Sequence, residues 1–176
     1  YKTAQAILLS LPPSTVLSVG LLCEVHAVLC EGVIAPHRAG RLRNGNCRAG
    51  QAQFCAGRDV PMLLHKALTA IAELRARDDL NPTTIAAAAF FALLDVHPFP
   101  DGNGRLSRLV CNWLLYCGGM PCVINFCPSA PQRDAMIDAI KTTRLLCNLA
   151  PVVTFLEAQC CRVVDEYDKV CHKEVT

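Results

Sequence analysis

One short segment of the sequence, His97–Arg108, places a base, a carboxylate, two glycines and two arginines within twelve residues, HPFPDGNGRLSR. The imidazole of His97 has an ordinary pKa of about 6.5, so it can accept a proton near neutral pH. Asp101 carries a carboxylate that can hold Mg²⁺, which typically takes one or two carboxylates together with phosphate oxygens. These residue types therefore indicate proton transfer beside a metal-bound phosphate.

The corner Gly102-Asn103-Gly104 is expected to begin a helix. Glycines let the backbone approach a ligand closely, and the free amides at a helix start bind anions with the help of the helix dipole. Arg105 and Arg108 follow in the first turn, where the dipole disfavours cations. Two arginines placed against that preference indicate a phosphate chain as the ligand.

Hydrophobic spacing predicts helices on both sides of this segment and elsewhere in the chain. Asn81 followed by Pro82 is typical of a helix start, and that helix is expected to reach about Val96. The next helix is expected from about Arg105 to Cys117, where two glycines end it. Further helices are expected from Ser14 or Thr15 to about Glu31, and over 62–76, 131–146 and 150–170.

The stretch from Ala35 to Gly57 breaks the helical pattern. Its glycines, asparagines and arginines favour a long exposed loop, with a hairpin around Gly45 or Gly50. Long loops in compact domains are often functional. The arginines of this loop are expected to be mainly solvated, and a phosphate contact from the loop stays open.

Composition bounds the remaining possibilities. The chain has 176 residues, 52% of them apolar and only 6% aromatic, which favours a single helical domain over residues 1–176. A net charge of +2 does not indicate a nucleic-acid binder. The longest apolar run, Ile85–Leu94, is too short for a membrane span of about 20 residues. The start, Tyr1-Lys2-Thr3, has neither an initiator Met nor a charged leader, and the missing Met indicates a piece of a longer protein. We expect the protein to be cytoplasmic.

Twelve cysteines require an interpretation. Cys23, Cys30, Cys111 and Cys117 lie in apolar, helix-like stretches, where a thiol packs as a small hydrophobic group. No CxxC pair occurs in the sequence. We therefore expect buried free thiols, with disulfides or a metal site as the alternative.

The segment HPFPDGNGRLSR resembles the signature of Fic proteins, HxFx(D/E)GNGRxxR, at every fixed position. Residues Ala39–Arg43 resemble the Gly-Arg-x-Arg element of the family, and the irregular Asn44–Gly57 stretch falls where Fic proteins carry a flap hairpin that aligns the target peptide. Residues Asn112–Pro121 fit the family helix that follows the signature. The resemblance extends from about Leu21 to Leu156 and implies an all-α Fic core with a short flap.

The resemblance also implies an activity, the transfer of AMP from ATP to a Ser, Thr or Tyr hydroxyl of a target protein that docks at the flap. His97 would be the general base, and Asp101 would hold Mg²⁺ on the α- and β-phosphates. No nucleic-acid partner is implied, and a homodimer stays open. The remaining signature residues would bind the nucleotide: Gly102, Asn103 and Gly104 as the anion hole, Arg105 on phosphate oxygens, Arg108 on the terminal phosphate, and Phe99 as the anchor of the loop.

Two departures from the family pattern bear on these expectations. Relatives often have a Tyr shortly after the position of Arg133, where this chain has Met136 and Ile137. This difference bears on which nucleotide the site prefers. No (S/T)xxxE(G/N) inhibitory motif is found, because Thr69–Glu73 is followed by Leu74. The alternatives are AMP removal, phosphotransfer or another nucleotide transfer on the same scaffold, or a protein-binding module without catalysis. Doc-like phosphotransferases usually have Lys at the position of Gly104.

Overall fold

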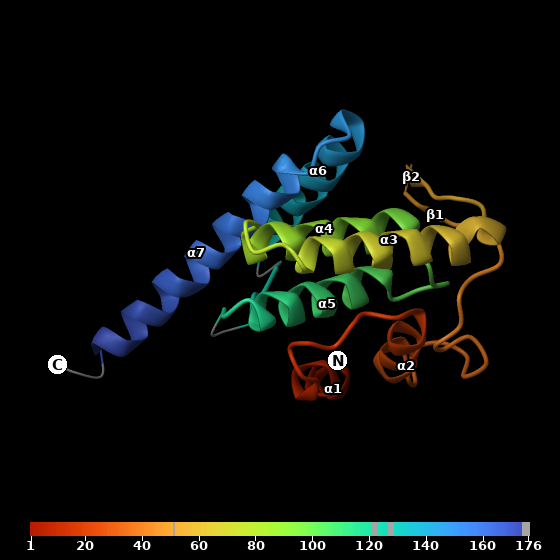
Figure 1. Cartoon of the computed structure of the whole chain (residues 1–176), viewed down its shortest axis with the longest axis horizontal. Helices are drawn as coiled ribbons and strands as arrows, with labels where there is room; N and C mark the ends of the chain where they lie inside the picture. The colour runs from red at the N-terminus through yellow and green to blue at the C-terminus, as the bar shows by residue number, and fades with distance from the viewer. Residues whose placement is uncertain (51, 121–122, 127–128, 174–176) are drawn as a thin grey trace.

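The computed structural model describes residues 1–50, 52–120, 123–126 and 129–173, with side chains up to 169. The prediction of an all-α fold is confirmed (Figure 1). The elements within the described residues are α1 (Lys2–Ser10), α2 (Val19–Leu29), β1 (Arg48–Ala49), β2 (Ala52–Gln53), the 3₁₀ turn η1 (Gly57–Asp59), α3 (Val60–Arg75), α4 (Pro82–Val96), α5 (Asn103–Cys117), α6 (Ala130–Leu146) and α7 (Ala150–Lys173).

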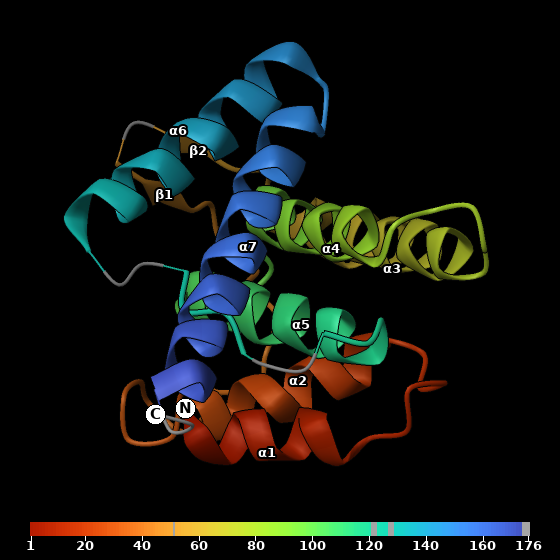
Figure 2. The same cartoon turned by 90° about the vertical axis from the view of Figure 1, so that its left-hand side faces the viewer.

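The helices are arranged around a central layer formed by α3, α4 and α5. Helices α1 and α2 pack on α5, while α6 pairs with α7, and α7 crosses α4 on another side (Figure 2). The short hairpin of β1 and β2 lies near the end of α4, at the site segment (Figure 1). Within the described residues, no helix has both the length and the apolar character needed to cross a membrane.

Helix α4 begins and ends as its sequence predicts. The side chain of Asn81 accepts a hydrogen bond from the Thr83 amide at 2.9 Å, which caps the helix, and Pro82 occupies its first turn. Helix α4 contains four consecutive alanines, Ala86–Ala89, followed by two phenylalanines, and Ala86, Ala89 and Phe90 are all at most 1% exposed. Because small side chains allow close approach, α4 can pack against neighbours on several sides.

The first two helices differ from the prediction. Residues 2–10 are helical, although no helix is expected there from the sequence. Helix α2 starts at Val19, several residues after the expected cap at Ser14 or Thr15. Ser18 is the cap, because its extended backbone lets its hydroxyl accept from the Leu21 amide at 3.1 Å.

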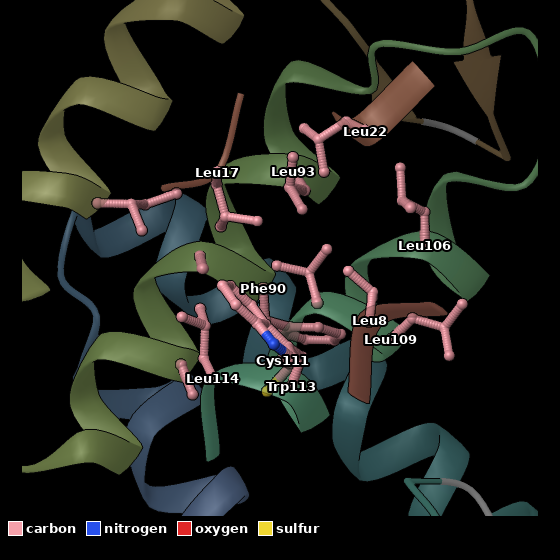
Figure 3. Close-up of a cluster of buried hydrophobic side chains, with 14 of the residues drawn as sticks. Leu8, Leu17, Leu22, Phe90, Leu93, Leu106, Leu109, Cys111, Trp113 and Leu114 are labelled. Carbon is pink, nitrogen blue, oxygen red and sulfur yellow. The ribbon is translucent and has the colours of Figure 1, made fainter. Parts of the chain in front are cut away.

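A cluster of buried side chains joins α1, α2, α4 and α5 (Figure 3). Phe90, Trp113 and Leu8 are each at most 1% exposed. Cys111 is part of this cluster, and burial raises the pKa of its thiol well above the ordinary value. Among the cysteines whose side chains the structure describes, Cys30, Cys111 and Cys160 are buried, and Cys30 and Cys111 are free thiols.

The loop before α3 folds into the expected hairpin. Arg48 pairs with Gln53 and Ala49 with Ala52, in antiparallel register. Gly50, one of the two predicted turn positions, lies between the strands with a positive φ of 58°.

The junction between the end of α5 and the start of α4 yields a stability prediction. A Cβ at Gly118 would lie 2.3 Å from Pro82 Cβ, so an added methyl group must push the two helices apart. We expect Gly118→Ala to lower the free energy of unfolding by roughly 1–3 kcal/mol in urea denaturation. Gly20→Ala is the matched control, because its Cβ would meet only Ser18 Oγ at 3.8 Å. Equal stability of both variants and the parent would contradict the packing described here.

Candidate active site

The segment between α4 and α5 turns through two left-handed residues. His97 ends α4 with φ 51°, and its amide donates to the Leu93 carbonyl at 3.1 Å. Gly102, with φ 76°, precedes α5, and its carbonyl accepts the Leu106 amide at 2.9 Å. A Cβ at Gly102 would also lie 2.7 Å from Cys30 Sγ, so both the backbone conformation and the space require glycine. The signature segment thus forms a tight corner between two helices.

The His97 imidazole is half-buried and held in one orientation. Its Nδ1 lies 3.3 Å from the Leu94 carbonyl, which can only accept, so the proton is assigned to Nδ1 and the lone pair to Nε2. The Phe54 ring, just after β2, stacks on the imidazole with ring centroids 3.9 Å apart. The side chain is therefore arranged to accept a proton at Nε2.

The pKa of His97 is lowered below its ordinary value of 6.5, mainly by burial. The positive charges of Arg43 and Arg144 lower it further, whereas the hydrogen bond to Leu94 and the carboxylate of Asp101 oppose the shift. Arg144 of α6 lies over the Phe54 ring, 5.5 Å from its centroid, and pairs with Asp95 at 2.8 Å. His97 is accordingly neutral, and competent as a base, at pH 7.

Arg43 holds the end of α4. Its guanidinium is buried and donates to the carbonyls of His97 at 2.6 Å, Val96 at 3.2 Å, Gly45 at 2.8 Å and Cys55 at 2.9 Å. The last carbonyls of a helix lack intrahelical partners, and these bonds satisfy two of them. One side chain thus joins the loop before the flap, the flap and the backbone of the candidate base. The sequence interpretation of solvated loop arginines is wrong for Arg43.

His26 of α2 holds the other end of the corner. Its Nδ1 accepts the Gly40 amide at 2.9 Å, so Nε2 carries the proton and donates to the Asp101 carbonyl at 2.9 Å. The ring also stacks on Phe99 at 3.9 Å. Burial lowers the pKa of His26, chiefly because a charged imidazole would be poorly solvated there. His26 therefore acts in its neutral form as a structural support.

Asn103 and Phe99 close the corner internally. The Asn103 side chain accepts the Phe99 amide at 2.9 Å and donates to the Phe99 carbonyl at 2.8 Å. Because both of its polar groups are used and it is 3% exposed, Asn103 can serve an anion through its backbone amide only. Phe99 is 0% exposed, as expected for the anchor of the loop.

Asp101 and the start of α5 carry the charged groups of the corner. Asp101 Oδ1 accepts the Gly102 amide at 2.6 Å, and Oδ2 lies 3.7 Å from Arg105. The next three amides, at residues 103–105, open the helix, where an intrahelical acceptor is lacking. The positive end of the helix dipole thus lies beside a carboxylate that is 60% exposed.

A pocket of about 720 Å³ lies next to this helix start, a size suited to a nucleotide. Arg105 and Arg108 line it, whereas His97 and Asp101 lie outside its wall. Arg105 connects the two regions through its ion pair with Asp101. The other lining residues are Tyr1, Val123, Ile124, Asn125, Phe126, Arg133, Met136 and Ile137.

One wall of this pocket is fixed by a buried amide. Asn112 of α5 accepts the Ile124 amide at 2.8 Å and donates to the Ile124 carbonyl at 3.2 Å. The Asn112 side chain is 4% exposed, so both hydrogen bonds are buried. Met136 and Ile137, singled out where relatives often have a Tyr, both reach the pocket.

The structure thus brings the predicted site residues to one corner, with Arg105 and Arg108 facing the pocket. Sequence reasoning missed the roles of Arg43, Phe54 and Arg144, which come from distant segments and carry no spacing signal toward His97.

The family model for Fic/DOC proteins matches residues 16–115 of this chain, more than half of its length. The chain belongs to the Fic/DOC family. A curated relative, the protein adenylyltransferase Fic of Drosophila mojavensis, is 51% identical over 47 residues, which is 27% of this chain and 9% of the relative. The chain therefore spans only a small part of the length of the curated relatives that it matches.

Solved Fic structures share the fold. Fic-1 from C. elegans superimposes with a TM-score of 0.77 at 22% identity, covering 98% of this chain and 50% of that protein. The N-terminal Fic domain of a Bartonella quintana protein, described with bound ADP, has a TM-score of 0.68 at 20% identity, with 90% and 79% covered. At these identities the likeness establishes the helical fold of the Fic core.

The two buried histidines predict how stability depends on pH. Both have pKa values lowered from 6.5, so the unfolded chain binds more protons than the folded chain as the pH falls through that value. The free energy of unfolding is then highest above about pH 7 and decreases toward pH 5, by at most about 1.4 kcal/mol per pH unit for each group. Urea titrations of the parent and His26→Gln measure this, and the variant should show a shallower decrease. An identical pH dependence would contradict the assignment of His26 as a neutral support.

Proposed function

We propose that this Fic domain is a protein adenylyltransferase that transfers AMP from ATP to a hydroxyl side chain of a target protein. The observation that carries the proposal is the orientation of His97, with Nδ1 directed at the Leu94 carbonyl and Nε2 left as a proton acceptor beside a helix start. The name of the curated Drosophila relative supports the same reaction class.

In the proposed step, His97 Nε2 takes the proton of the target hydroxyl as its oxygen attacks the α-phosphorus of ATP. A bond forms between that oxygen and the α-phosphorus, the bond from the α-phosphorus to the bridging oxygen breaks, and pyrophosphate leaves. The lowered pKa of His97 keeps the imidazole neutral, so it is ready to accept the proton at pH 7. Phe54 and Leu94 hold the ring in place, which favours a reactive geometry.

The phosphates are assigned to the corner and to the pocket beside it. The amides at the start of α5, including those of Asn103 and Gly104, provide an anion hole, with Gly102 supplying the backbone turn. Arg105 binds phosphate oxygens and Arg108 the terminal phosphate, because both residues line the pocket. The base of the nucleotide is directed toward Met136 and Ile137.

Asp101 fits the role of a Mg²⁺ ligand. Its carboxylate is 60% exposed and lies at the helix start, and one carboxylate with phosphate oxygens is a common magnesium ligand set. When bound, the cation would neutralise negative charge on the phosphate oxygens. The ion pair of Asp101 with Arg105 would orient both side chains toward the same phosphate group.

Gly104 favours nucleotidyl transfer over phosphotransfer. A Cβ at this position would meet only Arg108 Nη1, at 3.7 Å, so the fold itself does not require glycine here. A missing side chain at the mouth of the anion hole leaves room for the β-phosphate instead. Gly104 is in this respect unlike Gly102, where the fold demands glycine.

The reaction is tested by incubating the chain with Mg²⁺, candidate target proteins and ATP labelled at either the α- or the γ-phosphate. We expect label from α-labelled ATP and an added AMP in the intact mass of the chain or a target. His97→Ala should reduce labelling by roughly 10²–10⁴-fold, because a positioned base contributes about that much. Label from γ-labelled ATP alone would replace this proposal with phosphotransfer. A His97→Ala variant that stays folded and fully active would refute the role of the base.

The role of Gly104 has a separate prediction. Gly104→Ala should leave the midpoint of thermal unfolding close to that of the parent, because the new methyl group has space in the fold. AMP transfer should nevertheless decrease by roughly tenfold or more, since displacing the reacting phosphate by a fraction of an ångström disturbs its alignment. Ser107→Ala is a control in the same helix, since that hydroxyl donates to the Gly104 carbonyl, at 3.1 Å, and the substitution adds no side chain at the helix start. An undiminished rate for Gly104→Ala would contradict the clearance argument.

A further inference from the structure

The stretch from Gly32 to Arg58 contains five arginines and no aspartate or glutamate. The whole chain has 17 basic and 15 acidic residues, so positive charge is concentrated here and the rest of the chain is net negative. A segment that carries only positive charge, on a protein that is nearly neutral overall, indicates binding to a negatively charged partner rather than a contribution to general solubility.

These five arginines differ in their burial and in their partners. Arg43 is buried and its donors are used by backbone carbonyls. Arg58 lies 3.8 Å from Asp59. Arg38, Arg41 and Arg48 are exposed, and none of the three has a carboxylate within 4.0 Å in the part of the chain that the structure describes.

Two of the exposed arginines line a hollow of about 420 Å³. Arg38 and Arg41 share it with His37, with residues 42–47 and with Pro100. No acidic residue lines this hollow among the described residues. It can therefore hold one or two carboxylate side chains against two guanidinium groups.

The hollow lies on the flap side of the candidate base. Pro100 belongs to the corner that begins at His97, and the lining residue Arg43 donates to the His97 carbonyl at 2.6 Å. Arg105 and Arg108 line the other pocket, and the two pockets share no lining residue. The positive charge of the loop is thus separate from the groups assigned to the nucleotide and lies where a polypeptide would approach His97.

We propose that this hollow selects the target: it binds an acidic stretch of the polypeptide whose hydroxyl is modified. This proposal rests on the adenylyltransferase function and names the chemistry of its second substrate. Carboxylates of Asp or Glu within a few residues of the hydroxyl pair with Arg38 and Arg41. The hollow fits a short peptide segment better than a nucleic acid backbone, because the surrounding chain is net negative.

Peptide binding tests the proposal without relying on turnover. Three fluorescein-labelled peptides of twelve residues are used, each with a central Ser. On one side of that Ser, the first peptide carries three Glu, the second three Gln and the third three Lys. Binding is measured by fluorescence anisotropy with the His97→Ala chain, which cannot consume the peptide. Two exposed ion pairs should make the Glu peptide bind roughly three- to tenfold tighter than the Gln peptide at low salt, and less so at high salt.

The double variant Arg38→Gln/Arg41→Gln should bind the Glu and Gln peptides equally. Arg77→Gln is the matched control, because Arg77 is an exposed arginine after α3 that pairs with Asp79 at 2.6 Å, and it should keep the preference. Equal affinity of the parent for Glu and Gln peptides would overturn the inference, and so would equally tight binding of a single-stranded oligonucleotide of matched charge.

AMP transfer by the chain with an intact His97 is measured in parallel. Transfer without a preference for the Glu peptide overturns the target selection alone. Preferential binding of the Glu peptide with no AMP transfer to any hydroxyl overturns the proposed function. The binding site for an acidic peptide would still be supported by that result.

Discussion

The corner between α4 and α5 depends on donors that reach its backbone carbonyls from other parts of the chain. A helix end leaves carbonyls without partners, and burying them unpaired is costly. Arg43 supplies bonds to Val96 and His97, and His26 supplies one to Asp101. These bonds hold the corner at both of its ends. The base at one end and the free amides at the other therefore keep a fixed separation, which is what positioning a nucleotide and a hydroxyl requires.

The same contacts also set the chemistry of the corner. Arg43 lies close enough to His97 to lower its pKa while bonding its carbonyl, so one residue supports both geometry and protonation state. The flap adds Phe54, which stacks on the His97 ring, and α6 adds Arg144 over the ring of Phe54. Arginines then line two separate hollows, Arg105 and Arg108 in one and the exposed Arg38 and Arg41 in the other.

Much of the fold and of the candidate site could be predicted, because the sequence signals for them lie within short segments. The start of α4 depends on Asn81 and Pro82, and the candidate base, carboxylate and glycines lie in one contiguous segment. The remaining features depend on contacts between distant residues. Arg43 and His97 are 54 positions apart, and nothing in their spacing shows that one binds the carbonyl of the other. The stack of Phe54 on His97 arises only once the flap folds back over α4. Helix α1 was missed because it begins at Lys2, well before its apolar run Ile7–Leu9.

The protonation state of His97 is the most direct test of this account, and it can be read by NMR of imidazole nitrogens in the ¹⁵N-histidine-labelled chain during a pH titration. We predict a pKa below 6.5 for His97 and a neutral form with the proton on Nδ1. His26 provides an internal reference, because its partners require the opposite tautomer, with the proton on Nε2. A His97 that titrates at or above 6.5, or that carries its neutral-form proton on Nε2, would contradict the proposed base.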